Sequence, residues 1–380
     1  MIYLDNAATT APLPEVGQEV LRVMQEAYFN PSAAYGPAFD SEKRLSAARR
    51  QVAARMGAPA DRVFFTSGGT ESDNTALFGG AYLARARARR IVVSAGEHPA
   101  VLQAARRLGS LGWQVVELPL EADGTVSPAA LERALEQETS LVSILHVNNE
   151  TGAINDIAAL VAVTRRRAPR ALFHCDGVQA LGKVPVDVKT LGVDSYAVSG
   201  HKIHGPRGVG ALYLRERLDI VGLTGGGQES GVRSGTENLP AICGFALACE
   251  RADPVAMAPI ATLKERLWAG IQAACPGALR NGPAAGMGAP NILSVAFPGV
   301  RGEVLLHALE QEDILVGTGS ACSARKQQVS HVLLAMGLPK ARADGTLRLS
   351  LSRMTTAEQV DAAASRIAAC ANLLARYQRR

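Results

Sequence analysis

The feature of the sequence that most constrains the fold is an alternation of short apolar runs with longer stretches rich in Ala and Arg. The short runs contain many β-branched or aromatic residues and end at Gly or Pro, which favours strands, whereas the longer stretches have the apolar period of a helix. Strands that alternate with helices are typical of a parallel sheet covered by helices. We therefore expect an α/β fold with a mostly parallel seven-stranded sheet, formed by residues 63–66, 91–94, 114–118, 141–147, 171–174, 195–198 and 210–214.

The pattern changes near Ala252-Asp253-Pro254, where a second unit is expected to begin. A chain of 380 residues is long for one hydrophobic core, because single cores stop growing at roughly 250 to 300 residues. We expect a large domain at 13–252 and a smaller α/β domain formed by 1–12 and 253–380. The smaller domain is expected to contain helices at 260–274 and 357–376 and strands at 292–297, 315–317 and 347–351.

Composition and charge exclude several classes of protein. With 47% hydrophobic and 20% charged residues, the chain can bury a large core. The net charge of +5 comes from basic and acidic residues that are interspersed, with few aromatic residues beside basic ones. This pattern is not typical of a nucleic-acid-binding surface, so we expect no binding to nucleic acid. No signal-peptide pattern and no long uncharged apolar run occur, so we expect a soluble cytoplasmic protein that contacts no membrane. Six scattered cysteines without a C-x-x-C pair predict neither a metal site nor a disulfide framework.

A glycine turn follows the first predicted strand and leads into a predicted helix, with Gly68, Gly69 and Thr70 at its centre. Glycines allow close approach of the backbone, and free N–H groups at a helix N-terminus, with the Thr70 hydroxyl, make an anion site. The turn lacks the G-x-G-x-x-G spacing of dinucleotide sites and the G-K-[ST] ending of triphosphate sites. An ordinary strand-to-helix turn is the alternative interpretation.

Two further residues, Lys202 and Asp176, each follow a strand that is expected to be buried. Lys202 is flanked by glycines and by hydroxyl and imidazole donors, so desolvation would favour loss of its charge and formation of a Schiff base. A solvated surface lysine is the alternative. A buried carboxylate at Asp176 needs a partner, and a protonated pyridine nitrogen would keep it ionised. A helix N-cap explains Asp176 equally well.

Taken together and in order, the motifs of the chain resemble those of the cysteine desulfurases, from residue 3 to about residue 355. The motifs that carry the resemblance lie at 3–10, 66–74, 97–99, 146–152, 176–179, 199–210, 225–229, 233–238, 319–323 and 347–351. The short segment Gly319-Ser320-Ala321-Cys322 resembles the NifS and IscS branch. The resemblance implies the fold-type I architecture of the class V aminotransferase group, pyridoxal 5′-phosphate as cofactor and a homodimer.

The resemblance also implies a role for each residue around the cofactor. Lys202 would hold the cofactor as a Schiff base, and Asp176 would pair with its pyridine nitrogen. His98 would stack on the ring and assist proton transfer. The remaining implied contacts are the hydrogen bond of Gln179 to the phenolic oxygen, the phosphate contacts of Gly69, Thr70, Ser199 and His201, and a phosphate contact of Thr236 from the other subunit.

The substrate implied by the resemblance is L-cysteine. Arg348 would grip its α-carboxylate in a bidentate manner, with Asn149 beside the carboxylate and the cofactor. Cys322, as thiolate, would attack the substrate sulfur and keep it as a persulfide while alanine leaves. Either His98 or the substrate takes the thiol proton. A sulfur-acceptor protein, either an iron–sulfur scaffold or a thiolation protein, would then receive the sulfur, with a transient iron contact at Cys322 in the first case.

Basic residues after Cys322 depart from the family pattern. Arg325 and Lys326 stand where relatives have small or acidic residues. These charges either raise the thiolate fraction of Cys322 and contact an acidic acceptor, or they form a solvated surface. Two other functions stay open: another enzyme of the same fold, such as an aminotransferase or a selenocysteine lyase, and a non-catalytic homologue that binds a partner.

Overall fold

The computed structural model describes residues 1–216, 218–319 and 329–377. Its larger sheet has seven strands in the order β2-β8-β7-β6-β5-β3-β4, and β8 runs antiparallel to both of its neighbours while the other pairs are parallel. The predicted α/β fold with a mostly parallel sheet is therefore confirmed. The strands are β2 (Val63–Thr66), β3 (Arg90–Ser94), β4 (Gln114–Leu118), β5 (Thr139–Ser143), β6 (Leu172–Asp176), β7 (Ser195–Ser199) and β8 (Gly210–Leu214).

The direction of the strands decides where the loops of the site meet. Because β2 and β7 are both antiparallel to β8, β2 runs in the same direction as β3, β5, β6 and β7. The carboxyl ends of these five strands therefore lie at one edge of the sheet. The strand predicted at 141–147 corresponds to β5 and ends at Ser143, because β3 has ended and only bonds to β6 continue, such as His146 N to Asp176 O at 2.9 Å.

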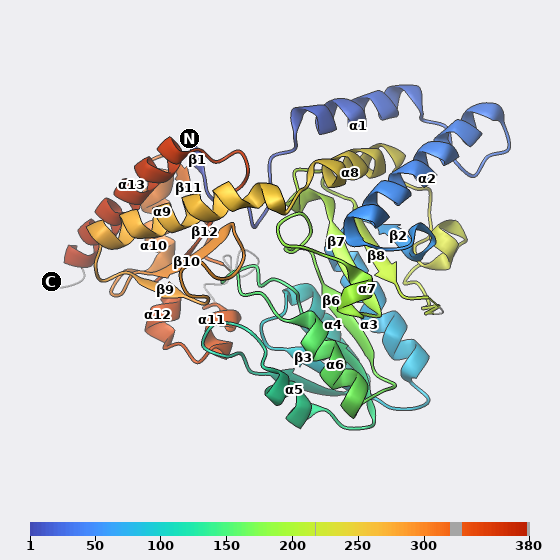
Figure 1. Cartoon of the computed structure of the whole chain (residues 1–380), viewed down its shortest axis with the longest axis horizontal. Coiled ribbons are helices and arrows are strands. Elements are labelled where there is room, and N and C mark those ends of the chain that lie inside the picture. The colour runs from blue at the N-terminus through green and yellow to red at the C-terminus, as the bar shows by residue number, and fades with distance from the viewer. Residues whose placement is uncertain (217, 320–328, 378–380) are drawn as a thin grey trace.

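Helices cover the larger sheet, and α3 packs against its middle strands (Figure 1). The helix α1 lies beside α8, which also packs on α2. Local sequence explains several helix starts: Pro99 and Pro128 occupy first turns, and Ser127 caps the helix that follows it. The helices of this part are α1 (Pro14–Glu26), α2 (Gly36–Met56), α3 (Gly69–Ala84), α4 (Pro99–Ser110), α5 (Pro128–Ala134), α6 (Ile157–Arg167), α7 (Val188–Leu191) and α8 (Leu239–Arg251).

A smaller antiparallel sheet in the order β12-β10-β9 lies apart from the larger one (Figure 1). Both helices predicted beyond residue 253 are present, as are the strands predicted at 292–297 and 347–351, with small shifts of their bounds. The strand predicted at 315–317 is found instead at Ile314–Leu315, where β11 pairs with the N-terminal strand β1. These elements are β1 (Ile2–Tyr3), α9 (Ala258–Ala274), β9 (Leu279–Asn281), β10 (Ile292–Ala296), α10 (Gly302–Glu310), β11 (Ile314–Leu315), α11 (His331–Ala335), α12 (Lys340–Asp344), β12 (Thr346–Ser350) and α13 (Ala357–Tyr377).

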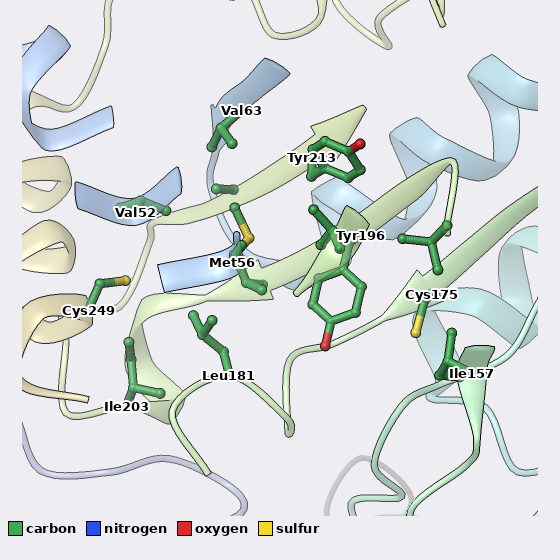
Figure 2. Packing of buried hydrophobic residues seen from close by; sticks show 14 of the residues in the cluster. Val52, Met56, Val63, Ile157, Cys175, Leu181, Tyr196, Ile203, Tyr213 and Cys249 are labelled. Atoms are coloured by element: carbon green, nitrogen blue, oxygen red, sulfur yellow. The ribbon is translucent and has the colours of Figure 1, made fainter. Parts of the chain in front are cut away.

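Separate groups of buried apolar side chains stabilise the two sheets. Figure 2 shows part of the group beside the larger sheet, where Met56 of α2 lies near Tyr196 of β7 and Leu181. A second group joins β10 and β12 to α9 and α13. The separation supports a domain boundary at residue 252, which stays a prediction. Among the residues that the structure describes, no helix is both long and apolar enough to cross a membrane.

The N-terminal segment connects the two parts of the molecule. Asn6 and Ala7 bind the end of β12 through Asn6 Nδ2 to Ser350 O at 2.9 Å and Ala7 N to Ser350 Oγ at 2.8 Å. A few residues later, Thr10 N donates to the carbonyl of His201 at 3.0 Å, beside the carboxyl end of β7. The first ten residues therefore link the smaller sheet to the strand ends of the larger one.

Candidate active site

A cavity of about 590 Å³ opens at the carboxyl ends of the strands of the larger sheet and reaches β12 of the smaller one. Open α/β sheets bind ligands at this edge. Most of the residues predicted from the sequence line this cavity. They are Gly69, Thr70, His98, Asn149, Asp176, Gln179, Ser199, His201, Lys202 and Arg348.

One end of the cavity is built to hold an anion. The sixteen-residue helix α3 begins at Gly69, so its free N–H groups face this end. A Cβ on Gly69 would lie 2.5 Å from Cγ2 of Val178, which explains why the close approach of the two segments needs glycine there. Thr70 is exposed in the first turn, and Ser199 Oγ lies 3.8 Å from where a Cβ of Gly68 would be.

Lys202 and His201 lie on the short turn that follows β7. Lys202 Nζ donates to the carbonyl oxygens of Ala7 at 2.7 Å and Ala8 at 2.6 Å. Burial, followed by the charge of Lys202, lowers the pKa of His201 to about 4. His201 is therefore neutral at neutral pH and contributes a hydrogen bond rather than a charge.

Asp176 ends β6 and forms a buried wall of the cavity. The residue is 7% exposed, and its Oδ1 accepts the N–H of Val178 at 2.9 Å. Asp176 therefore caps the turn that follows β6, but this contact uses only Oδ1 and leaves Oδ2 for another partner. Burial raises the pKa of Asp176, against the opposing charges of His98 and Lys202. A cationic group in the cavity would favour the ionised carboxylate.

His98 caps α4 and fixes its own tautomer in doing so. Its Nδ1 accepts the N–H of Ala100 at 3.1 Å, so in the neutral ring the proton is on Nε2. Burial lowers the pKa of His98, and the charges of Lys202 and His331 add to this effect against that of Asp176. The ring is therefore a neutral donor at the cavity wall.

The site residues together fit a flat ligand with a phosphate at one end and a cationic ring nitrogen. The helix N-terminus with Ser199 suits the phosphate, and the buried carboxylate of Asp176 suits the nitrogen. The amine of Lys202 lies in the same cavity, where it can react with an aldehyde. This donor set is the one expected for pyridoxal 5′-phosphate.

Arg348 brings the smaller sheet into the cavity. Its side chain is 3% exposed, and Nη2 lies 2.6 Å from Asp5 Oδ1 while Nη1 donates to the carbonyl of Asn149 at 3.0 Å. Its Nε is buried and has no hydrogen-bond partner among the described residues. The guanidinium therefore keeps donors for a carboxylate ligand.

Sequence reasoning missed Asp73, which also lines the cavity. Asp73 Oδ1 lies 3.2 Å from His174 Nε2, and burial raises the pKa of Asp73 well above its usual range, with Asp176 adding to the effect. The residue follows Thr70 by three positions, so both lie on one face of α3. That spacing was the signal that could have found it.

Glu150 and His331 were also missed. Glu150 is 4% exposed and accepts a hydrogen bond from Ser330, and a Cβ on Gly319 would lie 2.7 Å from its Oε2. His331 Nε2 donates to the carbonyl of Glu97 at 3.0 Å. Glu150 lies on the loop that follows β5 of the larger sheet, whereas His331 reaches the cavity from the smaller part of the molecule, and no local pattern predicts that second contact.

Two predicted residues are not brought to the cavity in the described part of the chain. Thr236 is exposed and does not line it, so a contact of Thr236 with the phosphate would have to come from another subunit. Cys322 lies outside the described residues, as do Arg325 and Lys326. Their predicted roles therefore stay predictions.

Comparisons with known proteins identify the family of the chain. Residues 2–363 match the family model of the aminotransferase class-V proteins. The cysteine desulfurase IscS of Clostridium botulinum is 39% identical over 365 residues, which cover 95% of this chain and 91% of that protein.

Solved structures give the same result. A NifS-like protein superposes with a TM-score of 0.92 at 35% identity, covering 98% of this chain and 99% of that one. A structure described as SspA in complex with cysteine superposes with a TM-score of 0.83 at 31% identity, covering 94% and 100%. Since the family match spans nearly the whole chain and these relatives share its fold and length, the chain belongs to the class-V aminotransferase family, within its IscS- and NifS-like cysteine desulfurase group.

Proposed function

We propose that the chain converts L-cysteine to L-alanine, keeps the sulfur as a persulfide on Cys322 and delivers it to an acceptor protein. The observation that carries the proposal is that one cavity brings together Lys202, Asp176, His98 and Arg348. These are an amine, a buried carboxylate, an imidazole and a guanidinium, the groups that this reaction requires. Relatives named cysteine desulfurase support the choice of reaction.

The proposed cofactor is pyridoxal 5′-phosphate, held by the helix N-terminus at Gly69 and Thr70, by Ser199 and His201, and by Asp176. When bound, it supplies an aldehyde that condenses with amines and a ring that takes up the electron pair of a bond to Cα. Gln179 lines the same cavity with its Nε2 donating to the carbonyl of Ala7 at 2.8 Å. Its second Nε2 proton would be the donor to the phenolic oxygen of the bound cofactor.

The proton transfers of the reaction are assigned to Lys202 and His98. Lys202 Nζ accepts the proton from Cα of the substrate and later returns it, with the carbonyls of Ala7 and Ala8 orienting the amine. His98 carries a proton on Nε2, so in this geometry it donates to a group in the cavity rather than accepts from one. The substrate is held by Arg348, whose unused N–H groups bind the α-carboxylate.

Cys322 is the proposed sulfur carrier. Its thiolate attacks the sulfur of the substrate, the S–S bond forms as the C–S bond breaks, and the carbon takes up protons to give alanine. Burial raises the pKa of each of the other cysteines, which are Cys175, Cys243, Cys249, Cys275 and Cys370. None of these five is an activated thiolate, which supports Cys322 in that role.

A homodimer and a cytoplasmic location complete the proposal. Large apolar side chains are exposed along α1, α2 and the segment between them, and exposed patches of this kind mark protein contacts. They are Leu21, Met24, Tyr28, Tyr35 and Phe39. The five described cysteines are free thiols, as expected in a reducing compartment.

The function is tested by giving L-cysteine to the purified protein and to its Cys322→Ala variant. The parent should form alanine and gain one sulfur atom on the Cys322 peptide, seen by mass spectrometry, while the variant still binds cysteine but forms neither product. A Cys275→Ala variant, which loses a half-buried thiol in the smaller part of the molecule, serves as the matched control and should behave as the parent.

Other outcomes would select the other functions. Alanine formation that survives in Cys322→Ala only with selenocysteine would identify a selenocysteine lyase. Transfer of the amino group to a keto acid would identify an aminotransferase. A parent that binds no cofactor and converts no amino acid would leave only a partner-binding role.

A further inference from the structure

Lys183 carries a buried amine beside the active-site cavity without lining it. The residue is 7% exposed, and Nζ donates to Oε1 of Gln179 at 2.9 Å. The charges that act on it most are those of Lys202 and Arg348, and both are positive. No ion pair with a described carboxylate offsets the burial of this amine.

Keeping a lysine here is costly. Removing an ammonium group from water costs several kcal/mol when no opposite charge compensates. Burial, followed by the charges of Lys202 and Arg348, lowers the pKa of Lys183 to about 7. A methionine would fill a similar volume without this cost. The hydrogen bond to Gln179 is therefore the feature that a lysine supplies and an apolar side chain does not.

The contact determines which way the amide of Gln179 points. The protonated amine of Lys183 only donates, and its hydrogen bond to Gln179 places Oε1 toward Lys183 and Nε2 on the opposite side. There Nε2 donates to Ala7 O at 2.8 Å, and the same carbonyl accepts from Lys202 Nζ at 2.7 Å. Hydrogen bonds thus run without a break from Lys183 through Gln179 and Ala7 to Lys202.

The backbone places both side chains for this contact. Gln179 and Lys183 are four residues apart in the consecutive turns that follow β6, so they lie on one side of the chain. Between them Gly182 has φ +70°, and a Cβ there would lie 2.6 Å from Cβ of Ala252. Lys183 and Lys202 also share a small cavity of about 40 Å³ behind the main one.

We propose that Lys183 is a positioning residue, which holds Oε1 of Gln179 so that the Nε2 donors face the phenolic oxygen of the bound cofactor. Lys183 itself touches neither cofactor nor substrate. The inference rests on the proposed function, because Gln179 has this task only if the cofactor is pyridoxal 5′-phosphate. The inference goes beyond the proposed function, because it gives a role to Lys183, a buried amine that takes no part in the reaction steps.

The test is a double-mutant cycle with Lys183→Met and Gln179→Ala. The affinity for added pyridoxal 5′-phosphate is measured on protein stripped of cofactor, and the absorption spectrum of the bound cofactor is recorded against pH. We expect Lys183→Met to weaken binding about tenfold and to shift the pH at which the spectrum changes. In the Gln179→Ala background, adding Lys183→Met should change the cofactor affinity by no more than about twofold and should leave the pH of the spectral change where it was.

Lys264→Met is the matched control. Lys264 is 2% exposed, donates from Nζ to Ala289 O at 2.8 Å and has a pKa lowered by burial, but it lies in the smaller part of the molecule and lines no part of the active-site cavity. This variant should keep the cofactor affinity of the parent. Melting temperatures show that each variant is folded, and Lys183→Leu, which also lacks a donor, replaces the methionine variant if that one does not fold. Lys183→Gln keeps an N–H donor and should keep most of the affinity.

Equal losses from Lys183→Met with and without Gln179 would overturn the inference, because Lys183 would then act independently of the amide. Unchanged affinity and spectrum in Lys183→Met would also overturn it. These results differ from failure of the proposed function, in which the unmodified protein would bind no pyridoxal 5′-phosphate and form no alanine.

Discussion

Three carboxyl groups, those of Asp73, Glu97 and Asp176, are buried close together at the active-site cavity. They are 1%, 0% and 7% exposed, and burial followed by the charge of Asp176 raises the pKa of both Asp73 and Glu97. Like charges in a buried site cannot all ionise without a compensating cation. A cationic pyridine ring beside Asp176 would reduce this repulsion, so the same arrangement that is unfavourable for the protein alone suits the proposed cofactor.

The contact of Arg348 with the substrate leads to a prediction for cysteine turnover. Replacing Arg348 by Ala should lower kcat/KM by a factor that corresponds to about 2 kcal/mol or more of lost transition-state stabilisation, because the substrate carboxylate loses its partner. Cofactor binding should be kept. Steady-state kinetics with L-cysteine measure the first quantity, and the cofactor absorption measures the second. Arg348→Lys should recover little, since an ammonium cannot form the bidentate contact.

Arg342→Ala provides the matched control for this change. Arg342 lies in the same part of the molecule and donates from Nε to Asn281 Oδ1 at 2.7 Å, but it does not line the cavity. Its loss should affect melting temperature more than kcat/KM. Identical kcat/KM in Arg348→Ala and the parent would place the substrate carboxylate elsewhere.

At the scale of elements, the start of α3 is the feature that positions the anion end of the site. Replacing Gly69 by Ala should weaken binding of pyridoxal 5′-phosphate about tenfold, because the new Cβ would lie 2.5 Å from Cγ2 of Val178 and push the two segments apart. Adding Val178→Ala should restore much of the affinity by making room. Titration of stripped protein with the cofactor measures both effects.

Gly36→Ala is the control for this prediction, because Gly36 also begins a helix and a Cβ there meets nothing within 4 Å. Its cofactor affinity should equal that of the parent. Failure of Val178→Ala to restore binding would show that the loss has a cause other than crowding.

Most strands were predictable from the sequence, because they are short runs rich in β-branched or aromatic residues with clear ends. The predicted runs 63–66, 114–118 and 210–214 are strands with those bounds. The short strands β1 and β9 were missed, since two or three partly exposed residues carry no periodic signal and pair only through distant contacts.

The site was predictable to the extent that its residues follow strands. Asp176 ends β6 and Lys202 lies in the short turn after β7, so the sheet places them at one edge without further information. His331 reaches the cavity only through the packing of the smaller part of the molecule against the larger one, whereas Glu150 lies on the loop after β5 and its place after a strand was a usable signal. The burial of Lys183 was not predictable from the sequence, because it depends on the turns after β6, which pack Gly182 against Ala252.

At the scale of the whole molecule, the exposed Thr236 leads to a prediction about assembly. If Thr236 completes the phosphate site of a second subunit, mixed dimers of Thr236→Ala and Lys202→Ala chains contain one site with both residues intact. Half of the sites in such dimers should therefore regain the parent's affinity for pyridoxal 5′-phosphate and its alanine formation. Each variant alone should show weakened binding or no turnover, respectively.

Sedimentation velocity of both variants is the control for this experiment, because each must form the same assembly as the parent. Mixed dimers that bind the cofactor no better than Thr236→Ala alone would place Thr236 outside the phosphate site. If the parent protein is a monomer, Thr236 cannot contact the phosphate of a second subunit, and the prediction is wrong.

The N-terminal segment has a consequence for the time at which the enzyme becomes complete during its synthesis. Asn6 and Ala7 bind Ser350, which follows them by 344 and 343 residues, and the carbonyls of Ala7 and Ala8 orient Lys202. Asn6 and Ala7 therefore cannot take their places until Ser350 has been synthesised, more than three hundred residues later. A growing chain has the strands of its large sheet long before it has a finished cavity, so we expect tight binding of the cofactor only after residue 350 has been synthesised.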